Sequence, residues 1–517
     1  MNNIKTVLAS FLLASGATTA MAGGILTNTN QSIDFLRNPA RDAAIGLDGV
    51  YSNPAGVSFM PEGFHLGVNW QYAHQTRTVT STDNVFALGK KNNGQTTKTF
   101  EGVADAPVIP SIQAAWVKGD WTVQFNFSIP AGGGRCEFDN GLGSFERAVG
   151  QIAGTFMGLD QLSTTLNGLT GSTIPVGGVN GYNMDSYMEG RQYYYGFQLG
   201  TSYKVLDNLS VYGGLRLLYG NATYKARINN IQVRTTNGDI DFGTFLPRVS
   251  QQMSQIMPAA AQVQALLAQK AAAGATLTPQ EMTLKGTIEN LSAMQQSGSL
   301  NSLAKYASGV NLLCNQSGVG IAPVVGVDYK LNDHFNFAAK YEFKTQVRMK
   351  NESTVFEAHE IEAVNKYRDG EEVNEDSPAL VTLGAQWSPI SEVRINAGGH
   401  YYFDKQAEWY GNSQDKLDHN SYEILAGAEW DVTDRLTISA GGQLTRYGLT
   451  DDYMNDMSFV VNSYSIGFGA NYQLRDNVVL KAAFFQTEYG NYERQQPTID
   501  SFTRTNRVLG LGLEVNL

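Results

Sequence analysis

The sequence has little of several features that mark other classes of protein. It contains only 2 cysteines among its 517 residues, and charged residues make up only 16% of the chain. No segment rich in proline or serine divides it, so no linker between domains is evident. Its formal net charge is -11. Because phosphate binding needs clustered lysine and arginine, a nucleic-acid partner is not expected.

Long apolar runs are also absent. Beyond residues 1–22, no stretch approaches the ~20 consecutive apolar residues that a membrane-spanning helix needs. Residues 1–22 carry a lysine, an apolar stretch and the ending Ala20-Met21-Ala22, which is typical of a secretory signal peptide cleaved before Gly23. A buried N-terminal helix is the alternative. An exported chain without a membrane helix can cross a membrane only as a closed barrel.

Catalytic and metal-binding motifs are missing as well. The chain has no G-x-S-x-G, no H-E-x-x-H, no P-loop and no metal-like spacing of Cys and His. We therefore expect no enzymatic activity, no metal and no cofactor. A lipid-hydrolysing barrel stays an alternative, because a serine and a histidine could meet across neighbouring strands.

The last residues of the chain show what is present instead. In 507–517, Leu509, Leu511, Leu513, Val515 and Leu517 are apolar, and the residues between them are small or polar. A period of two with one apolar face predicts a strand. A final strand of this kind is typical of a membrane barrel, whose strands alternate between lipid and lumen.

About fourteen segments repeat this alternation, and short turns of Asp, Asn, Pro and Gly character alternate with longer loops. They lie at 64–72, 112–116, 121–129, 193–199, 209–217, 321–329, 335–343, 379–387, 393–403, 422–430, 436–444, 464–472, 478–485 and 507–517. The sequence predicts an all-β fold, a transmembrane antiparallel β-barrel of about 14 strands over residues 64–517. A soluble β-sandwich is the alternative, but it would not place large aromatics on one face of nearly every strand.

The two longest loops, about 132–190 and 229–318, contain helical signals. Phe145, Val149, Ile152, Phe156 and Leu159 form an apolar stripe at helical spacing. In the second loop, 249–270 favours a helix, and Thr278-Pro279-Gln280-Glu281 has the pattern of a capping box. We expect long, partly helical extracellular loops.

Residues 23–63 do not alternate and contain the repeated triplets Asn38-Pro39-Ala40 and Asn53-Pro54-Ala55. A segment of small residues ahead of a barrel suits a plug folded inside the lumen. A periplasmic tail is the alternative. The candidate motif of this plug is formed by Asn53, Pro54, Ala55 and Gly56.

The stretch Tyr51-Ser-Asn-Pro-Ala-Gly56, together with 107–116 and 120–134, resembles the FadL/TodX-type outer-membrane transporters of long-chain fatty acids and hydrophobic compounds. The resemblance is specific over about residues 40–135. It implies a monomer in outer-membrane lipid, with passive uptake gated by the N-terminal hatch and lateral exit at a kinked third strand. The matching place is formed by Ser128, Pro130, Gly132, Gly133 and Gly134, where proline removes a hydrogen-bond donor and glycine weakens pairing.

A fatty-acid carboxylate inside a barrel needs one or two cations beside apolar walls. The strand phase places five candidates on the lumen face: Arg216, Lys340, Lys344, Arg394 and Lys481. Lumen acids are expected to pair with most of them.

Cys136 and Cys314 fall in the two long loops of an exported chain, so a disulfide between them is possible. Two free thiols are the alternative. The long loops also leave open a surface adhesin or antigen, whose function would not need the N-terminal segment.

Overall fold

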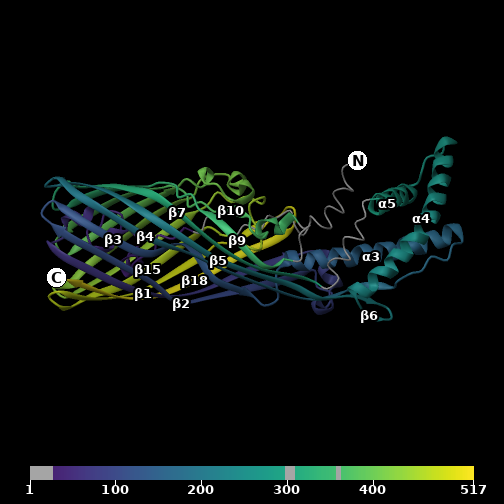
Figure 1. Cartoon of the computed structure of the whole chain (residues 1–517), viewed down its shortest axis with the longest axis horizontal. Helices are drawn as coiled ribbons and strands as arrows, with labels where there is room; N and C mark the ends of the chain where they lie inside the picture. The colour runs from purple at the N-terminus through teal and green to yellow at the C-terminus, as the bar shows by residue number, and fades with distance from the viewer. Residues whose placement is uncertain (1–26, 297–308, 357–361) are drawn as a thin grey trace.

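The computed structural model describes residues 27–296, 309–356 and 362–517. The predicted signal peptide lies outside these residues. The described chain forms a β-barrel with a helical arm that extends from one end (Figure 1). No helix in the described ranges is long and apolar enough to cross a membrane.

Fourteen strands close the barrel in antiparallel order, as the sequence predicts. In ring order they are β1 (Gly63–Thr82), β2 (Thr97–Lys118), β3 (Trp121–Phe138), β4 (Val179–Leu206), β5 (Leu209–Thr235), β7 (Val310–Lys330), β8 (Phe335–Glu342), β11 (Leu380–Ile390), β12 (Val393–Tyr402), β13 (Tyr422–Thr433), β14 (Leu436–Arg446), β15 (Ser463–Arg475), β16 (Val478–Tyr489) and β18 (Ile499–Asn516). Pairing between β1 and β18 closes the ring from His65↔Asn516 to Thr82↔Ile499.

Four short strands extend the wall on the side of the long loops: β6 (Gly238–Asp241), β9 (Arg348–Phe356), β10 (Glu372–Asn374) and β17 (Tyr492–Arg494). With them the described sheet has 18 strands. The tight turns lie at the opposite end, where the C-terminus is labelled (Figure 1).

The residues that alternate in the sequence lie on the outer and inner faces of the barrel wall in turn. Leu509, Leu511 and Leu513 are 51%, 56% and 42% exposed, whereas Val508 on the other face is buried. Large apolar side chains are exposed in the same way on most strands. Because lipid solvates apolar groups, this exposure fits a membrane-facing surface.

Several strands run far beyond the predicted segments, which corrects the boundaries of the two long loops. β4 has 28 residues and β5 has 27. At about 3.3 Å per residue, β4 is roughly 90 Å long, whereas the hydrocarbon core is about 30 Å thick. Most of the loop expected at 132–190 is therefore strand and helix.

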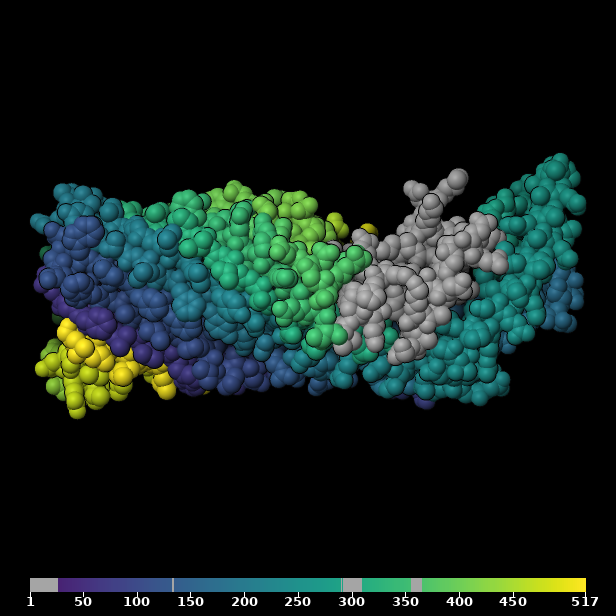
Figure 2. Space-filling view, in the orientation of Figure 1, coloured from purple at the N-terminus to yellow at the C-terminus, as the bar shows by residue number. Residues whose placement is uncertain are grey.

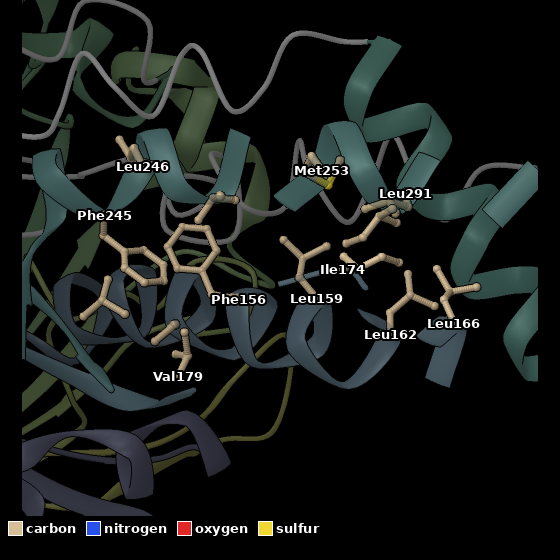
Figure 3. Packing of buried hydrophobic residues seen from close by; sticks show 14 of the residues in the cluster. Phe156, Leu159, Leu162, Leu166, Ile174, Val179, Phe245, Leu246, Met253 and Leu291 are labelled. Carbon is tan, nitrogen blue, oxygen red and sulfur yellow. The ribbon is translucent and has the colours of Figure 1, made fainter. Parts of the chain in front are cut away.

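The arm is formed by α3 (Gly143–Thr170), α4 (Phe242–Ala272) and α5 (Pro279–Gln296). The predicted apolar stripe lies on α3, where the Phe156 ring packs 5.3 Å from that of Phe245 on α4 (Figure 3). The Phe242 ring of α4 lies 6.2 Å from the Phe156 ring. The capping box is confirmed by two reciprocal hydrogen bonds between Thr278 and Glu281. Figure 2 shows α4 extending past the barrel.

Candidate functional site

Most of the described N-terminal segment, residues 27–62, is buried against inward-facing side chains of the barrel. It contains α2 (Ile33–Arg37), η1 (Leu47–Val50) and η2 (Gly56–Phe59), and every residue from 31 to 44 is buried. Ser32 begins α2 by accepting a hydrogen bond from the Phe35 amide at 3.1 Å. This short helix packs on β15, β16 and β18.

Small residues of the wall allow α2 to approach closely. The Phe35 ring lies 5.9 Å from that of Phe485. A Cβ added at Gly467 would overlap the carbonyl oxygen of Leu36, and one at Gly510 would meet both Ile33 and Leu36. Glycine on the inner face is therefore needed for this packing.

Buried ion pairs fix the middle of the N-terminal segment to the wall. Glu429 on β13 accepts from Arg37 at 2.9 Å and from Arg41 at 2.6 Å. Asp34 pairs with Lys481 on β16 at 2.5 Å. All five side chains are almost wholly buried. Removing one member of such a pair typically costs about 3–5 kcal/mol, because the other charge is left without compensation.

The triplet Asn53-Pro54-Ala55 with Gly56 lies at the opposite wall. Asn53 Nδ2 donates to Asp328 Oδ2 on β7 at 2.6 Å, and the Pro54 carbonyl accepts from Gln124 Nε2 at 2.7 Å. Ala55 is fully buried. A Cβ on Gly56 would overlap the Asn53 amide, so the turn has no room for a larger residue.

The pairing between β2 and β3 is interrupted. Ladder contacts run from Lys118↔Trp121 to Ile112↔Phe127, then stop until the single pair Val103↔Glu137. We call this stretch, residues 104–111 of β2 and 128–136 of β3, the wall gap. Unpaired backbone groups are costly at membrane depth, so something must satisfy them there.

Residues 27–31 supply hydrogen-bond partners for some of the backbone groups in the wall gap. The Asn28 amide donates to the Pro130 carbonyl at 2.7 Å, and Thr27 forms an antiparallel bridge with Ala131. The Gln31 side chain exchanges two hydrogen bonds with the Ile129 backbone, both 3.1 Å long. The Gln31 carbonyl also accepts from Ser111 Oγ at 2.6 Å, so this residue contacts both edges.

The residues proposed for a kink all lie on β3 within the wall gap. Ser128 Oγ is buried and accepts from Asn126 at 2.9 Å. Register shifts against β4 occur between Ser128 and Ala131 and between Ala131 and Gly134. Gly132 and Gly134 have φ of 116° and 73°, values that favour glycine, and Gly133 lies between them.

All five predicted lumen cations have carboxylate partners. Arg216 and Lys340 both contact Glu342, and Lys344 lies 3.4 Å from Asp376 and 3.2 Å from Glu408. Arg394 pairs with Glu429 and Asp431, and Lys481 with Asp34 and Glu514. Their charges are already compensated, so none is free to hold an anionic ligand without losing a partner.

Two arginines outside the predicted set differ in this respect. Arg77 on β1 lies directly opposite Arg504 on β18 in the strand register, and their exposed fractions are 7% and 8%. Neither forms an ion pair with a carboxylate in the described part of the chain, and both Nε atoms lack hydrogen-bond partners there. Arg504 donates to Gln75 at 3.1 Å and lies 5.0 Å from the Tyr489 ring.

A small cavity of about 40 Å³ adjoins Arg77. Its lining also includes Cys136, Phe138, Met188, Tyr224 and Met457, so a cation meets a mainly apolar wall. In the register Arg77 is opposite Gly102, the neighbour of Val103 at the upper edge of the wall gap. A volume near that of one or two waters admits only a small polar group, and a chain would need further opening.

The structure does not contain the disulfide considered between Cys136 and Cys314, and both thiols are free and buried. Cys136 is in register with Gly190, Gly190 with Tyr224, and Tyr224 with Cys314. Three strand spacings of about 4.8 Å separate the cysteines by roughly 14 Å, well beyond the Cα separation of a disulfide. Both lie on barrel strands and not in loops.

Of the six histidines in the sequence, His359 lies outside the described residues. None of the others is hydrogen-bonded to a serine hydroxyl. His400 lies between two carboxylates, with Nε2 2.9 Å from Asp42 and Nδ1 2.7 Å from Glu423. The Ser–His pairing that a lipid hydrolase needs is therefore not found among the described histidines.

Solved structures share this architecture. The chain matches a Pseudomonas aeruginosa FadL homologue with a TM-score of 0.56 and 12% identity, covering 96% of this chain and 100% of that one. It matches the P. putida toluene transporter TodX with a TM-score of 0.50 and 13% identity, covering 91% and 94%. No family model matches the sequence, and neither does any curated protein. The chain thus has the FadL/TodX-type barrel fold that its residues 40–135 resemble.

Proposed function

We propose that this protein is an outer-membrane channel for the passive uptake of hydrophobic compounds, with long-chain fatty acids or similar amphiphiles as its ligands. The observation that carries the proposal is the wall gap, together with its occupation by Thr27 to Gln31. A break in a barrel wall at this position offers a route into the bilayer, and a chain segment that occupies the break can act as its gate.

In this proposal residues 23–63 are the hatch, but only its first part moves. Neutral hydrogen bonds, each with a net value of about 0.5–1.5 kcal/mol, join Thr27 to Gln31 to the wall gap. Buried ion pairs of Asp34, Arg37 and Arg41 with the wall residues Lys481 and Glu429 hold the next part of the hatch, and breaking one of them leaves an uncompensated buried charge. Release of the first residues alone would open the wall gap between Ser128 and Gly134 while the rest of the hatch stays in place.

Arg77 and Arg504 form the proposed carboxylate site. Two buried guanidinium groups that face each other without a counter-ion repel, and an anion between them relieves that repulsion. Charge-assisted hydrogen bonds from arginine to a carboxylate are short and strong. The apolar lining beside Arg77 suits the first carbons of an alkyl chain.

The test is saturable binding of a labelled long-chain fatty acid to the refolded protein. We expect the double variant Arg77→Gln/Arg504→Gln to weaken binding by at least tenfold, since two charge-assisted hydrogen bonds are lost. Arg191→Gln serves as the matched control. Its side chain bonds Asn221 and Thr223 and lies outside the cavity lining. Equal affinity in both variants would refute the carboxylate site.

A second arm of the experiment tests the gate. Deleting Gly24 to Gln31 from the mature chain should leave equilibrium binding at the arginines intact but increase the escape of ligand into lipid vesicles. If neither binding nor escape changes, the N-terminal segment has no gating function, and the surface adhesin becomes the better interpretation.

A further inference from the structure

A polar cavity lies between the arm and the barrel rim, outside the transport route proposed above. It has a volume of about 520 Å³, within the range of roughly 300–1,000 Å³ that small-molecule sites occupy. Its lining comes from the β1–β2 loop, the start of β2, the turn between β3 and α3, α3 itself, and the extended parts of β4 and β5. None of the lining residues belongs to the wall gap.

The lining is polar, which excludes a hydrophobic cargo. Carboxylates and amides face cations across it, including Asp139, Asn140, Asn229 and Arg227. Its three lysines are already neutralised, because Lys90 pairs with Asp239, Lys91 with Asp185 and Lys98 with Glu146. Donors and acceptors of hydrogen bonds are therefore interspersed, with no concentration of one charge as a phosphate or polyanion site would need.

The cavity walls are held in place by their own contacts. Lys91 Nζ donates to the Met184 carbonyl at 2.9 Å, and Asn230 Nδ2 donates to Asp185 at 2.5 Å. Tyr182 donates to Glu146 at 3.2 Å. The Arg227 guanidinium lies 5.0 Å from the Tyr187 ring, which places a flat aromatic surface beside polar groups. Such a site is preorganised and does not need to order on binding.

We propose that this cavity binds a saccharide of a few sugar units. A hydroxyl group both donates and accepts, so a molecule rich in hydroxyls can match carboxylate, amide and guanidinium groups at once. Free oligosaccharides and the sugar part of a surface glycolipid share this chemistry. The site would fix the arm to sugars at the cell surface, and it is independent of the proposed transport function.

The experiment uses the full-length protein in detergent on an array of neutral and acidic bacterial oligosaccharides. We expect at least one glycan to bind, and Asp139→Ala/Arg227→Ala to weaken it by about tenfold or more. The cavity-filling Asn229→Trp variant should do the same. Asp434→Ala/Arg435→Ala, in the exposed turn between β13 and β14 at the other end of the barrel, is the control.

Binding of intact lipopolysaccharide is then compared with binding of its delipidated core, to distinguish a surface glycolipid from a free oligosaccharide as the ligand. Binding of the core shows that the sugar itself is recognised. The proposal is overturned if no glycan binds, if binding is undiminished in the cavity variants, or if lipopolysaccharide binds only with its acyl chains. Fatty-acid binding should be unchanged in every cavity variant, so failure here leaves the transport proposal untouched.

Discussion

The Nε2 atom of His400 on β12 lies 2.9 Å from Oδ1 of Asp42 in the N-terminal segment. The other ring nitrogen lies 2.7 Å from Glu423. An imidazole can donate to two carboxylates at once only when it is protonated. This side chain therefore connects the buried segment to the wall through charge as well as geometry.

Replacing the histidine should loosen the N-terminal segment. In His400→Gln two buried carboxylates face each other without a cation, at a cost of about 3–5 kcal/mol. We expect trypsin to cleave after Arg37 or Arg41 in the folded variant, whereas the wild-type segment resists. His419→Gln, an exposed position in the next loop, is the control. Equal protection in both variants would show that His400 does not hold the segment.

A reversible crosslink should lock the proposed gate. Thr27 and Ala131 are bridge partners, so Thr27→Cys/Ala131→Cys meets the distance that a disulfide needs. In a background with Cys136→Ala and Cys314→Ala, oxidation should block ligand transfer into vesicles and reduction should restore it. Transfer that continues at the wild-type rate after oxidation would contradict a route through the wall gap.

Arg504→Glu should stabilise the fold and abolish fatty-acid binding. The substitution places a carboxylate opposite Arg77 and converts an uncompensated pair into an ion pair. We expect the free energy of unfolding to rise by about 1–3 kcal/mol while fatty-acid binding is lost. Urea titration and ligand binding measure the two effects. A variant with lower stability and unchanged binding would contradict a ligand site at this pair.

The sequence predicts the membrane-spanning strands, because contact with lipid constrains their pattern of residues. At membrane depth every second side chain must be apolar, so a strand such as 507–517 is recognisable from its period. The α3 stripe and the Thr278 capping box are equally local patterns, and both are present in the structure. Each of these patterns can be recognised without knowing which distant residues the segment contacts.

Where the strands extend beyond the membrane, their side chains need not alternate between apolar and polar, and the predicted strand boundaries become less accurate. Both faces of β1 are mostly polar from residue 74 onward, so the segment around Arg77 resembled a loop. The proposed carboxylate site was missed for this reason. Cys136 was misplaced for the same reason, because β3 continues through its glycine run. No local signal in the sequence marks Arg77, because polar residues on both faces hide the alternation of the strand.

Charge pairing is the second limit, because it depends on register between distant strands. The strand phase placed Arg216 on the lumen face, where it is buried. Its partner Glu342 is 126 residues away and is set by how β5, β7 and β8 align. Likewise, Pro130 and its glycines mark a weak place in β3, but nothing local indicates that Gln31 satisfies it.

Asp404, in the loop after β12, predicts a pH dependence. Burial raises the pKa of its carboxyl to about 6, against the hydrogen bond from the Ser421 amide and the nearby His419. An acid whose folded pKa lies above its unfolded value stabilises the fold at low pH. This stability is lost as pH rises from about 4 to 6, by up to about 3 kcal/mol.

Hydrogen exchange of residues 403–421, corrected for the intrinsic rate, should therefore be slower at pH 4.5 than at pH 7. Asp404→Asn should abolish this difference, because the amide stays neutral throughout. Asp418→Asn, an exposed carboxylate of the same loop, should keep it. A loop that becomes more protected as pH rises would contradict the assignment.

The arm should unfold without the barrel. Phe156 is 2% exposed and packs against two rings of α4. Phe156→Ala leaves a cavity worth about 3–5 kcal/mol, which approaches the stability of a small helical unit. We expect rapid hydrogen exchange in α3 and α4 with unchanged exchange in β12 to β16. Leu169→Ala, at a position that is 58% exposed, should leave α3 protected. Because the proposed ligand site lies within the barrel, fatty-acid binding should survive in Phe156→Ala. Loss of binding would mean that the arm supports the lumen directly.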